Sequence, residues 1–217
     1  MQHIVERHKS LWKQKEFRTS TILGLIFFVC SIVVNGLANV FIVSRHVSNH
    51  VSDLILDNTP ALDVELIVVE GAVVLFFSVI VLLILRPSRI PFVVKSIALF
   101  ILIRALFMSL THIAPFPDHI LFEDNIALFR AMGVTGYGDF FFSGHTGMPF
   151  LLSLIFSYDK RLRNIFLAVS LLFGTSVLLG HLHYSIDVFA AFFITYGIFH
   201  MARYLFPKDY TLLRSGK

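Results

Sequence analysis

The sequence predicts an all-α integral membrane protein with a bundle of six transmembrane helices. Of its 217 residues, 56% are hydrophobic and only 15% are charged, and the mean hydropathy is +0.79. A soluble domain of this size would expose more charge and would not carry 24 Phe. The charged residues are also grouped, which leaves apolar runs that are close to the length of a membrane-spanning helix.

The first apolar run, residues 19–44, contains no charged residue. Residues 1–19 are polar and basic, and Trp12 and Phe17 among them are compatible with an amphipathic helix on the membrane surface. The run is long and lacks a small-residue cleavage site, so we expect a retained helix and not a removed signal peptide. The polar residues 45–63 then form an exposed loop.

The second and third runs cover residues 64–85 and 91–112. The second run ends at Arg86 and Pro87, because a proline after a basic turn stops a helix. Arg104 interrupts the third run. Both runs are long enough to span a bilayer as helices.

The fourth and fifth runs cover residues 140–158 and 165–180, and the fifth is at the short end for a spanning helix. The sixth follows the polar residues 181–187 and ends near residue 206. The expected organisation has three parts: a cytoplasmic N-terminal segment (1–19), a six-helix transmembrane domain (20–206) and a cytoplasmic basic tail (207–217).

The distribution of Lys and Arg predicts the orientation of the chain. Of the 18 basic residues, 15 fall in four segments that alternate with the other loops: 1–19, 86–95, 159–163 and 203–217. With six spans, these segments share one side, which the positive-inside rule assigns to the cytoplasm. Both termini are then cytoplasmic. The net charge of +4 therefore fits loops at a membrane surface and gives no reason to expect nucleic-acid binding.

Two polar clusters stand at the outward ends of apolar runs, in residues 138–146 and 181–187. In the second cluster, His183 and Asp187 are four residues apart at a helix start, so they share a face and can form a hydrogen bond. A carboxylate on one imidazole nitrogen fixes the tautomer and leaves the other nitrogen to attack or to take a proton.

The first cluster supplies a second imidazole, His145, which could give or accept a proton at the oxygen that leaves or enters. Two histidines and one aspartate suffice for phosphoryl transfer through a phosphohistidine. Gly138 and Gly144 would let the backbone approach a phosphate closely, with Ser143 and the amides at the helix start as donors. Together these residues favour a catalytic site over isolated interfacial side chains, since a carboxylate inside a span is costly.

Other interpretations of the same residues remain open. His181, His183 and Asp187 could bind a metal, although their spacing is loose and no thiolate is near. Arg104, the one cation in the outer half of the bundle, could bind phosphate or only pair with Glu70. A lipid or ion transporter could use Glu70, Arg104 and Asp187 as a charged pathway, but the sequence lacks signs of inverted repeats.

Residues 138–146 and 183–188 resemble the two signature motifs of the sphingomyelin synthase family, a branch of the type 2 phosphatidic acid phosphatase superfamily. Residues 104–117 are similar to a third family motif, and residues 53–60 resemble a fourth loosely. The resemblance implies a six-helix bundle with its site on the exoplasmic side, whether lumenal, extracellular or periplasmic. It implies an enzyme of sphingolipid metabolism that moves a phosphocholine-type headgroup from a glycerophospholipid to ceramide without a metal or other cofactor.

By this resemblance, His183 is the expected nucleophile, Asp187 its orienting carboxylate and His145 the acid/base. The residues expected to contact substrate are Asp139, Ser143, Gly144, Arg104, Tyr184 and His181. The expected partners are membrane lipids: a glycerophospholipid donor, with either a choline or an ethanolamine headgroup, and ceramide or another lipid acceptor. The sequence does not define the oligomeric state.

The sequence departs from the phosphatases of that superfamily, which carry a Lys six residues ahead of an Arg-Pro pair and a Ser-Arg pair ahead of the nucleophile. Here Val79 stands in the place of that Lys, and no Arg lies between Arg163 and His183. A phosphomonoester dianion would need those cations more than a diester does. A monoester phosphatase is therefore the weaker interpretation. The alternative to headgroup transfer is a hydrolase, either phospholipase C-like or a lipid phosphatase, that uses the same residues with water as the acceptor.

Overall fold

The computed structural model describes residues 2–44, 49–120 and 141–215, and within these ranges the regular structure is helical. The helices are α1 (Gln2–Lys13), α2 (Lys15–Val43), α3 (Gly71–Leu85), α4 (Ile90–Leu110), α6 (Gly144–Ile155), α7 (Lys160–Leu179), α8 (Ser185–Leu205) and α9 (Pro207–Ser215). Two 3₁₀ turns, η1 (Leu56–Asn58) and η3 (Pro87–Arg89), and one π-helical turn, η2 (Leu66–Glu70), connect them.

Five helical segments of the described chain are long and apolar enough to cross a membrane. They are Lys15–Ile42, Leu66–Leu85, Pro87–Leu110, Lys160–Leu179 and Ser185–Leu205. They correspond to the first, second, third, fifth and sixth apolar runs of the sequence. The chain is thus a multi-pass membrane protein with an all-helical architecture.

The fourth run differs from the expectation. Its helix, α6, has 12 residues, a length of about 18 Å, whereas the hydrocarbon core is about 30 Å thick. The helix begins late because Phe141 and Phe142 adopt positive φ angles of 149° and 28°, and because the Ser143 side chain caps it by accepting a hydrogen bond from the Thr146 N–H. Six full-length spans are therefore not confirmed.

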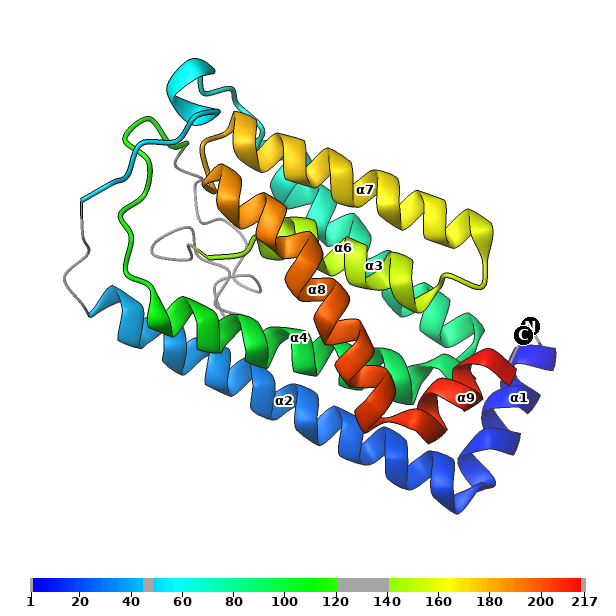
Figure 1. Cartoon of the computed structure of the whole chain (residues 1–217). Helices are drawn as coiled ribbons and strands as arrows, with labels where there is room; N and C mark the ends of the chain where they lie inside the picture. Colours follow the sequence, from blue (N-terminus) through cyan, green and yellow to red (C-terminus); the bar gives the residue numbers. More distant parts are fainter. Residues whose placement is uncertain (1, 45–48, 121–140, 216–217) are drawn as a thin grey trace.

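Helix α6 lies against α7 and α8, while α2 lies along α4 (Figure 1). The Ser170 hydroxyl of α7 donates to the Thr146 carbonyl of α6 at 2.7 Å. On another side of α6, a Cβ at Gly147 would lie 2.8 Å from both the Phe100 ring and the Thr195 hydroxyl. Glycine there lets α4 and α8 approach α6 closely, so the short helix is the centre of the packed core.

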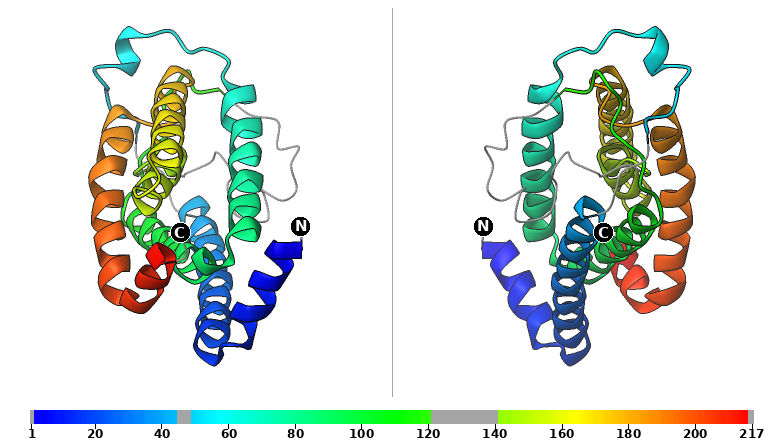
Figure 2. Two further views of the ribbon diagram at one scale, coloured as in Figure 1. Left: turned by 90° about the vertical axis from the view of Figure 1, so that its right-hand side faces the viewer. Right: turned by 90° about the vertical axis from the view of Figure 1, so that its left-hand side faces the viewer.

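Helix α3 stands apart from the rest of the bundle when the molecule is viewed end-on (Figure 2). At its start, a Cβ at Gly71 would lie 2.8 Å from the Phe173 ring of α7, and further along, Val79 is buried in the core. Most of its other large side chains are exposed, which suits a helix surrounded by lipid.

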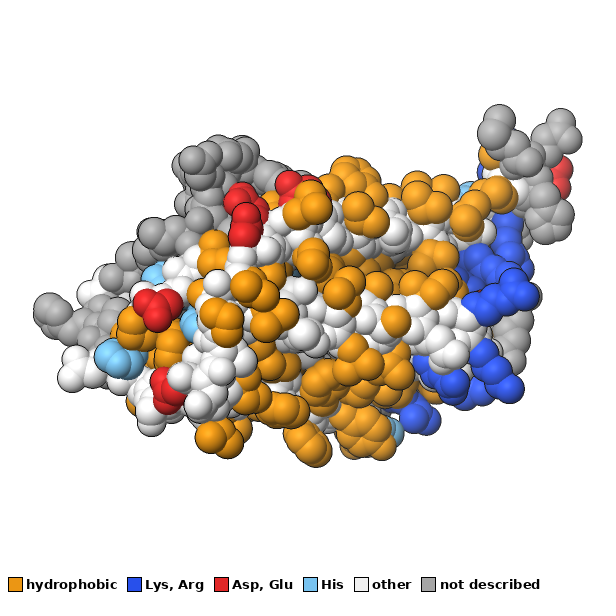
Figure 3. All heavy atoms as spheres, turned by 90° about the horizontal axis from the view of Figure 1, so that it is seen from above, with side chains coloured by type: hydrophobic (Ala, Val, Ile, Leu, Met, Phe, Trp, Pro, Cys, Tyr) orange, Lys and Arg blue, Asp and Glu red, His pale blue; other side chains and the backbone are white. Residues whose placement is uncertain are grey.

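Charge separates along the molecule. On the face seen in Figure 3, Lys and Arg side chains gather at one end, most Asp, Glu and His side chains lie toward the other, and apolar side chains cover the length between. The two termini lie at the basic end (Figure 1). This arrangement has the form that the positive-inside rule describes, and the assignment of the basic end to the cytoplasm stays a prediction.

The predicted basic tail is folded as helix α9, which a buried ion pair holds against the bundle. Lys95 Nζ of α4 lies 2.7 Å from Asp209 Oδ2, and it also donates to Ser20 Oγ of α2 at 2.6 Å. Ser20 in turn donates to Asp209 Oδ1 at 2.6 Å. One charged network therefore joins the first spanning helix, α4 and the C-terminal helix.

Candidate active site

The first turn of α8 holds the His183–Asp187 pair. Asp187 Oδ2 accepts a hydrogen bond from the Tyr184 N–H at 3.0 Å and lies 3.4 Å from His183 Nδ1. A carboxylate at this position is favoured because the first N–H groups of a helix lack partners within it. Both side chains are buried. Since Nδ1 faces the carboxylate, chemistry at this imidazole falls to Nε2.

The start of α6 is tied directly to the start of α8. The Ser143 N–H donates to the Asp187 carbonyl at 3.0 Å, so the two polar clusters meet although they are about forty residues apart in sequence. The buried hydroxyl of Ser143 accepts from the Thr146 N–H at 3.3 Å and caps α6. Ser143 therefore has a structural role beside its predicted contact with phosphate, which stays a prediction.

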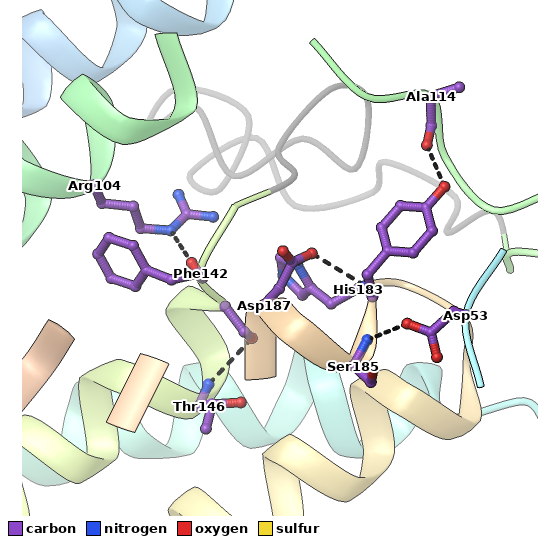
Figure 4. A network of polar contacts seen from close by, with 10 residues as sticks. Asp53, Arg104, Ala114, Phe142, Thr146, His183, Ser185 and Asp187 are labelled. Carbon is purple, nitrogen blue, oxygen red and sulfur yellow. Dashed lines mark hydrogen bonds and ion pairs between the residues drawn. The ribbon is translucent and has the colours of Figure 1, made fainter. Parts of the chain in front are cut away.

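Arg104 reaches across from α4 to the same place. Its Nε donates to the Phe142 carbonyl at 3.3 Å (Figure 4). A Cβ at residue 144 would lie 3.1 Å from that Nε, so Gly144 leaves room for the guanidinium beside the N-terminus of α6. Among the described residues, no ion pair joins Arg104 to Glu70, the alternative partner that the sequence had suggested.

His145 lies in the first turn of α6, close to His183 and Arg104. Its ring meets the Phe173 ring of α7 edge-on, with centroids 6.1 Å apart. Phe173 packs in turn against Gly71 at the start of α3. The candidate residues thus come from α4, α6 and the start of α8, while α7 and the start of α3 pack behind His145.

Two loops at the acidic end, residues 49–63 and 111–120, support the turn before α8. Asp53 Oδ2 accepts the Ser185 N–H at 2.7 Å, and its Oδ1 accepts the N–H groups of Ile55 and Leu56 at 2.9 and 3.2 Å. Burial alone would raise the pKa of Asp53, but these hydrogen bonds outweigh it and lower the pKa. The sequence assigned Asp53 no individual role, because nothing local signals a partner so far along the chain.

Tyr184 was expected to contact substrate, and the structure gives its hydroxyl two other partners. It donates to the Ala114 carbonyl at 2.8 Å and accepts from the Val51 N–H at 3.4 Å. The side chain is buried with Leu56 and Phe116. Tyr184 therefore fastens both loops of the acidic end to the start of α8, next to the His183–Asp187 pair.

His181 is buried beside this turn with a positive φ of 52°. Its ring meets Phe116 edge-on at 5.0 Å, and within the described ranges neither ring nitrogen has a hydrogen-bond partner. In the same ranges, no three His, Cys, Asp or Glu side chains are grouped as a metal site requires. Gly138 and Asp139 lie outside the described residues.

Fold and site together define a helical membrane protein with two histidines, one aspartate and one arginine around the start of a short buried helix. The family model for the C-terminal part of the PAP2 superfamily matches residues 137–204, which contain α6, α7, all but the last residue of α8, and most of the candidate site. Over these residues the chain is similar to the type 2 phosphatidic acid phosphatase superfamily. No curated protein and no solved structure matches the chain.

Proposed function

We propose that the protein is a transferase that moves a phospho-headgroup from a glycerophospholipid to ceramide or a similar lipid acceptor. The observation that carries the proposal is the buried His183–Asp187 pair, 3.4 Å apart, joined through the Asp187 carbonyl to the helix that bears His145. A histidine oriented by a carboxylate and faced by a second histidine is suited to covalent phosphoryl transfer.

In the first step, His183 Nε2 attacks the phosphorus of the donor and forms a P–N bond. The bond from phosphorus to the diacylglycerol oxygen breaks, and His145 gives its proton to that oxygen. Asp187 stabilises the positive charge on the His183 imidazole. Diacylglycerol leaves, and the headgroup phosphate stays on His183.

In the second step, His145 removes the proton from the acceptor hydroxyl. That oxygen attacks phosphorus, the P–N bond breaks, and His183 returns to its neutral form. The proton that His145 gave up in the first step is thus regained in the second. Arg104 and the N-terminal amides of α6 are proposed to bind the phosphate oxygens throughout.

The distribution of cations near the site favours a diester substrate. Among the described residues, Arg104 is the basic side chain that contacts the start of α6. Helix α7, which packs against α6, has its Lys and Arg residues in its first turn, and residues 164–182 contain none. A diester with one negative charge needs fewer cations than a monoester dianion. This difference supports a phosphodiester lipid as the donor.

The test uses purified protein in liposomes with labelled phosphatidylcholine, with and without ceramide. We expect labelled product only when ceramide is present, and we expect His183→Ala and Asp187→Ala to abolish it. His200→Ala is the matched control, because His200 is an exposed histidine near the other end of α8. Full activity in either site variant would exclude the assigned roles.

Hydrolysis is the second candidate, since the superfamily includes phosphatases. It uses the same residues with water in place of the acceptor hydroxyl. Headgroup release at the same rate with and without ceramide would favour it. Lipid flux across the liposome membrane without chemical change would instead favour a transporter.

A further inference from the structure

A second group of polar side chains lies at the basic end of the molecule, far from the proposed catalytic site. Arg89, the last residue of η3, is only 3% exposed. Its guanidinium carbon lies 5.1 Å from the Phe156 ring centre and 5.6 Å from that of Tyr158. Within the described ranges, no hydrogen bond or ion pair reaches its guanidinium N–H groups. A buried cation without an acceptor is costly, so this arrangement calls for a partner.

Two hydroxyl groups beside Arg89 also lack partners. Ser88 precedes it in η3 and is 3% exposed, and its Oγ has no hydrogen-bond partner in the described structure. The same holds for the buried hydroxyl oxygen of Tyr158, whose ring lies against the guanidinium. One hydroxyl is thus on the residue before Arg89 and the other on a ring that lies against its guanidinium, and in the described chain neither has an acceptor.

Charged side chains of both signs lie near Arg89. Arg86 and Arg7 lie close enough to repel its positive charge, and the carboxylate of Asp159 lies close enough to attract it. Asp159 Oδ1 already accepts the N–H groups of Arg161 and Leu162 at the start of α7. An anion at this place would thus meet a positive potential.

The position also joins separate parts of the chain. The η3 turn contacts α1, α3, α4 and α9. Close by, His8 of α1 lies 2.8 Å from the Ile84 carbonyl near the end of α3. A ligand bound to η3 would therefore stabilise the packing of both terminal helices against the bundle.

We propose that Arg89, Ser88 and Tyr158 bind a phosphate group at the basic end of the protein. The aromatic rings cover the face of the guanidinium, whereas its N–H donors lie in its plane and can bind two phosphate oxygens. The two hydroxyls would donate to further oxygens. The phosphate belongs either to an anionic lipid headgroup or to a soluble phosphate compound, which share this chemistry.

The experiment measures thermal unfolding of the full chain in nanodiscs. One arm adds inorganic phosphate to discs of phosphatidylcholine, with chloride at equal ionic strength as reference. The other arm compares discs with and without phosphatidic acid. We expect at least one probe to raise the Tm, and Arg89→Gln to weaken its binding about tenfold or more, as expected for the loss of a charge-assisted hydrogen bond.

Tyr158→Phe is a second test that does not depend on the folding of the Arg89 variant. It keeps the aromatic ring and removes only the hydroxyl. We expect it to weaken binding severalfold, whereas Arg161→Gln, at an exposed arginine of the same end, leaves binding unchanged. If inorganic phosphate stabilises the protein, the site binds a soluble phosphate compound. If only phosphatidic acid stabilises it, the site binds the phosphate of a lipid headgroup. No stabilisation by either probe, or equal stabilisation of wild type and both site variants, overturns the proposal.

Discussion

Asp53 accepts a hydrogen bond from the Ser185 N–H at 2.7 Å, across 132 residues of sequence. This contact lets a loop at the acidic end cap the helix that carries Asp187. Because Tyr184 binds that loop and a second one through its hydroxyl, the turn before α8 is held on two sides. The histidine of this turn, His183, is therefore positioned by residues that need not touch a substrate.

Asp53→Ala should destabilise the protein by about 1–2 kcal/mol, the usual cost of removing a helix cap. It should also lower kcat more than it changes KM, since it disturbs His183 and leaves Arg104 in place. Thermal unfolding and liposome kinetics measure the two effects. Asp118→Ala, which removes an exposed carboxylate from a neighbouring loop, is the comparison. Wild-type kinetics in Asp53→Ala would show that the cap does not position His183.

The lowered pKa of Asp53 predicts a pH dependence of stability. The pKa of this carboxyl group is lower in the folded protein than its ordinary value of 3.8. Such a group stabilises the folded state at pH values above its ordinary pKa. This contribution is lost as the pH falls through the folded pKa. Wild type should therefore lose stability faster than Asp53→Asn below about pH 5, which unfolding curves at a series of pH values measure. Parallel pH profiles would contradict the prediction.

Gly144→Ala should displace Arg104, because the new Cβ would lie 3.1 Å from its Nε. We expect kcat/KM to fall roughly tenfold, as for one lost charge-assisted hydrogen bond to the phosphate. The control is Gly197→Ala on α8, where a Cβ would meet nothing within 4 Å. That variant should keep its activity and unfold at the same or a higher temperature. Equal activity of both variants would count against the role of Arg104.

Lys95→Met should release α9, because it leaves Asp209 as a buried carboxylate without its cation. Removing one partner of a buried pair costs about 3 kcal/mol or more. Limited proteolysis of α9 and the unfolding temperature give the readouts. The double variant Lys95→Met with Asp209→Leu should be more stable than Lys95→Met alone. A less stable double variant would show that the unpaired carboxylate is not what destabilises the single variant.

Five spans and the meeting of the two polar clusters could be predicted from the sequence, because long apolar runs and helix-spaced His183 and Asp187 leave few alternatives. The length of α6 could not be predicted in this way. Hydropathy counts apolar residues, whereas the start of α6 depends on the positive φ of Phe142 and on the Ser143 cap. Both depend on backbone conformation, which hydropathy does not report.

The contacts of Asp53 and α9 were missed for a different reason. Both depend on partners distant in sequence: Ser185 for Asp53 and Lys95 for Asp209. A polar loop and a basic tail have the composition of solvent-exposed segments, and nothing within either segment indicates its partner. Such pairings become visible only when the helices are placed in space.

The late start of α6 also sets the depth at which a substrate would react. His145 meets Phe173, which lies six residues, or roughly 9 Å along the helix, before α7 ends at Leu179. To react at His145, a donor phosphate would have to move deeper into the bilayer than the headgroups of neighbouring lipids. An acceptor hydroxyl at the boundary between the polar and apolar layers would already lie near the depth of His145. The short helix would then select an acceptor by its depth in the bilayer.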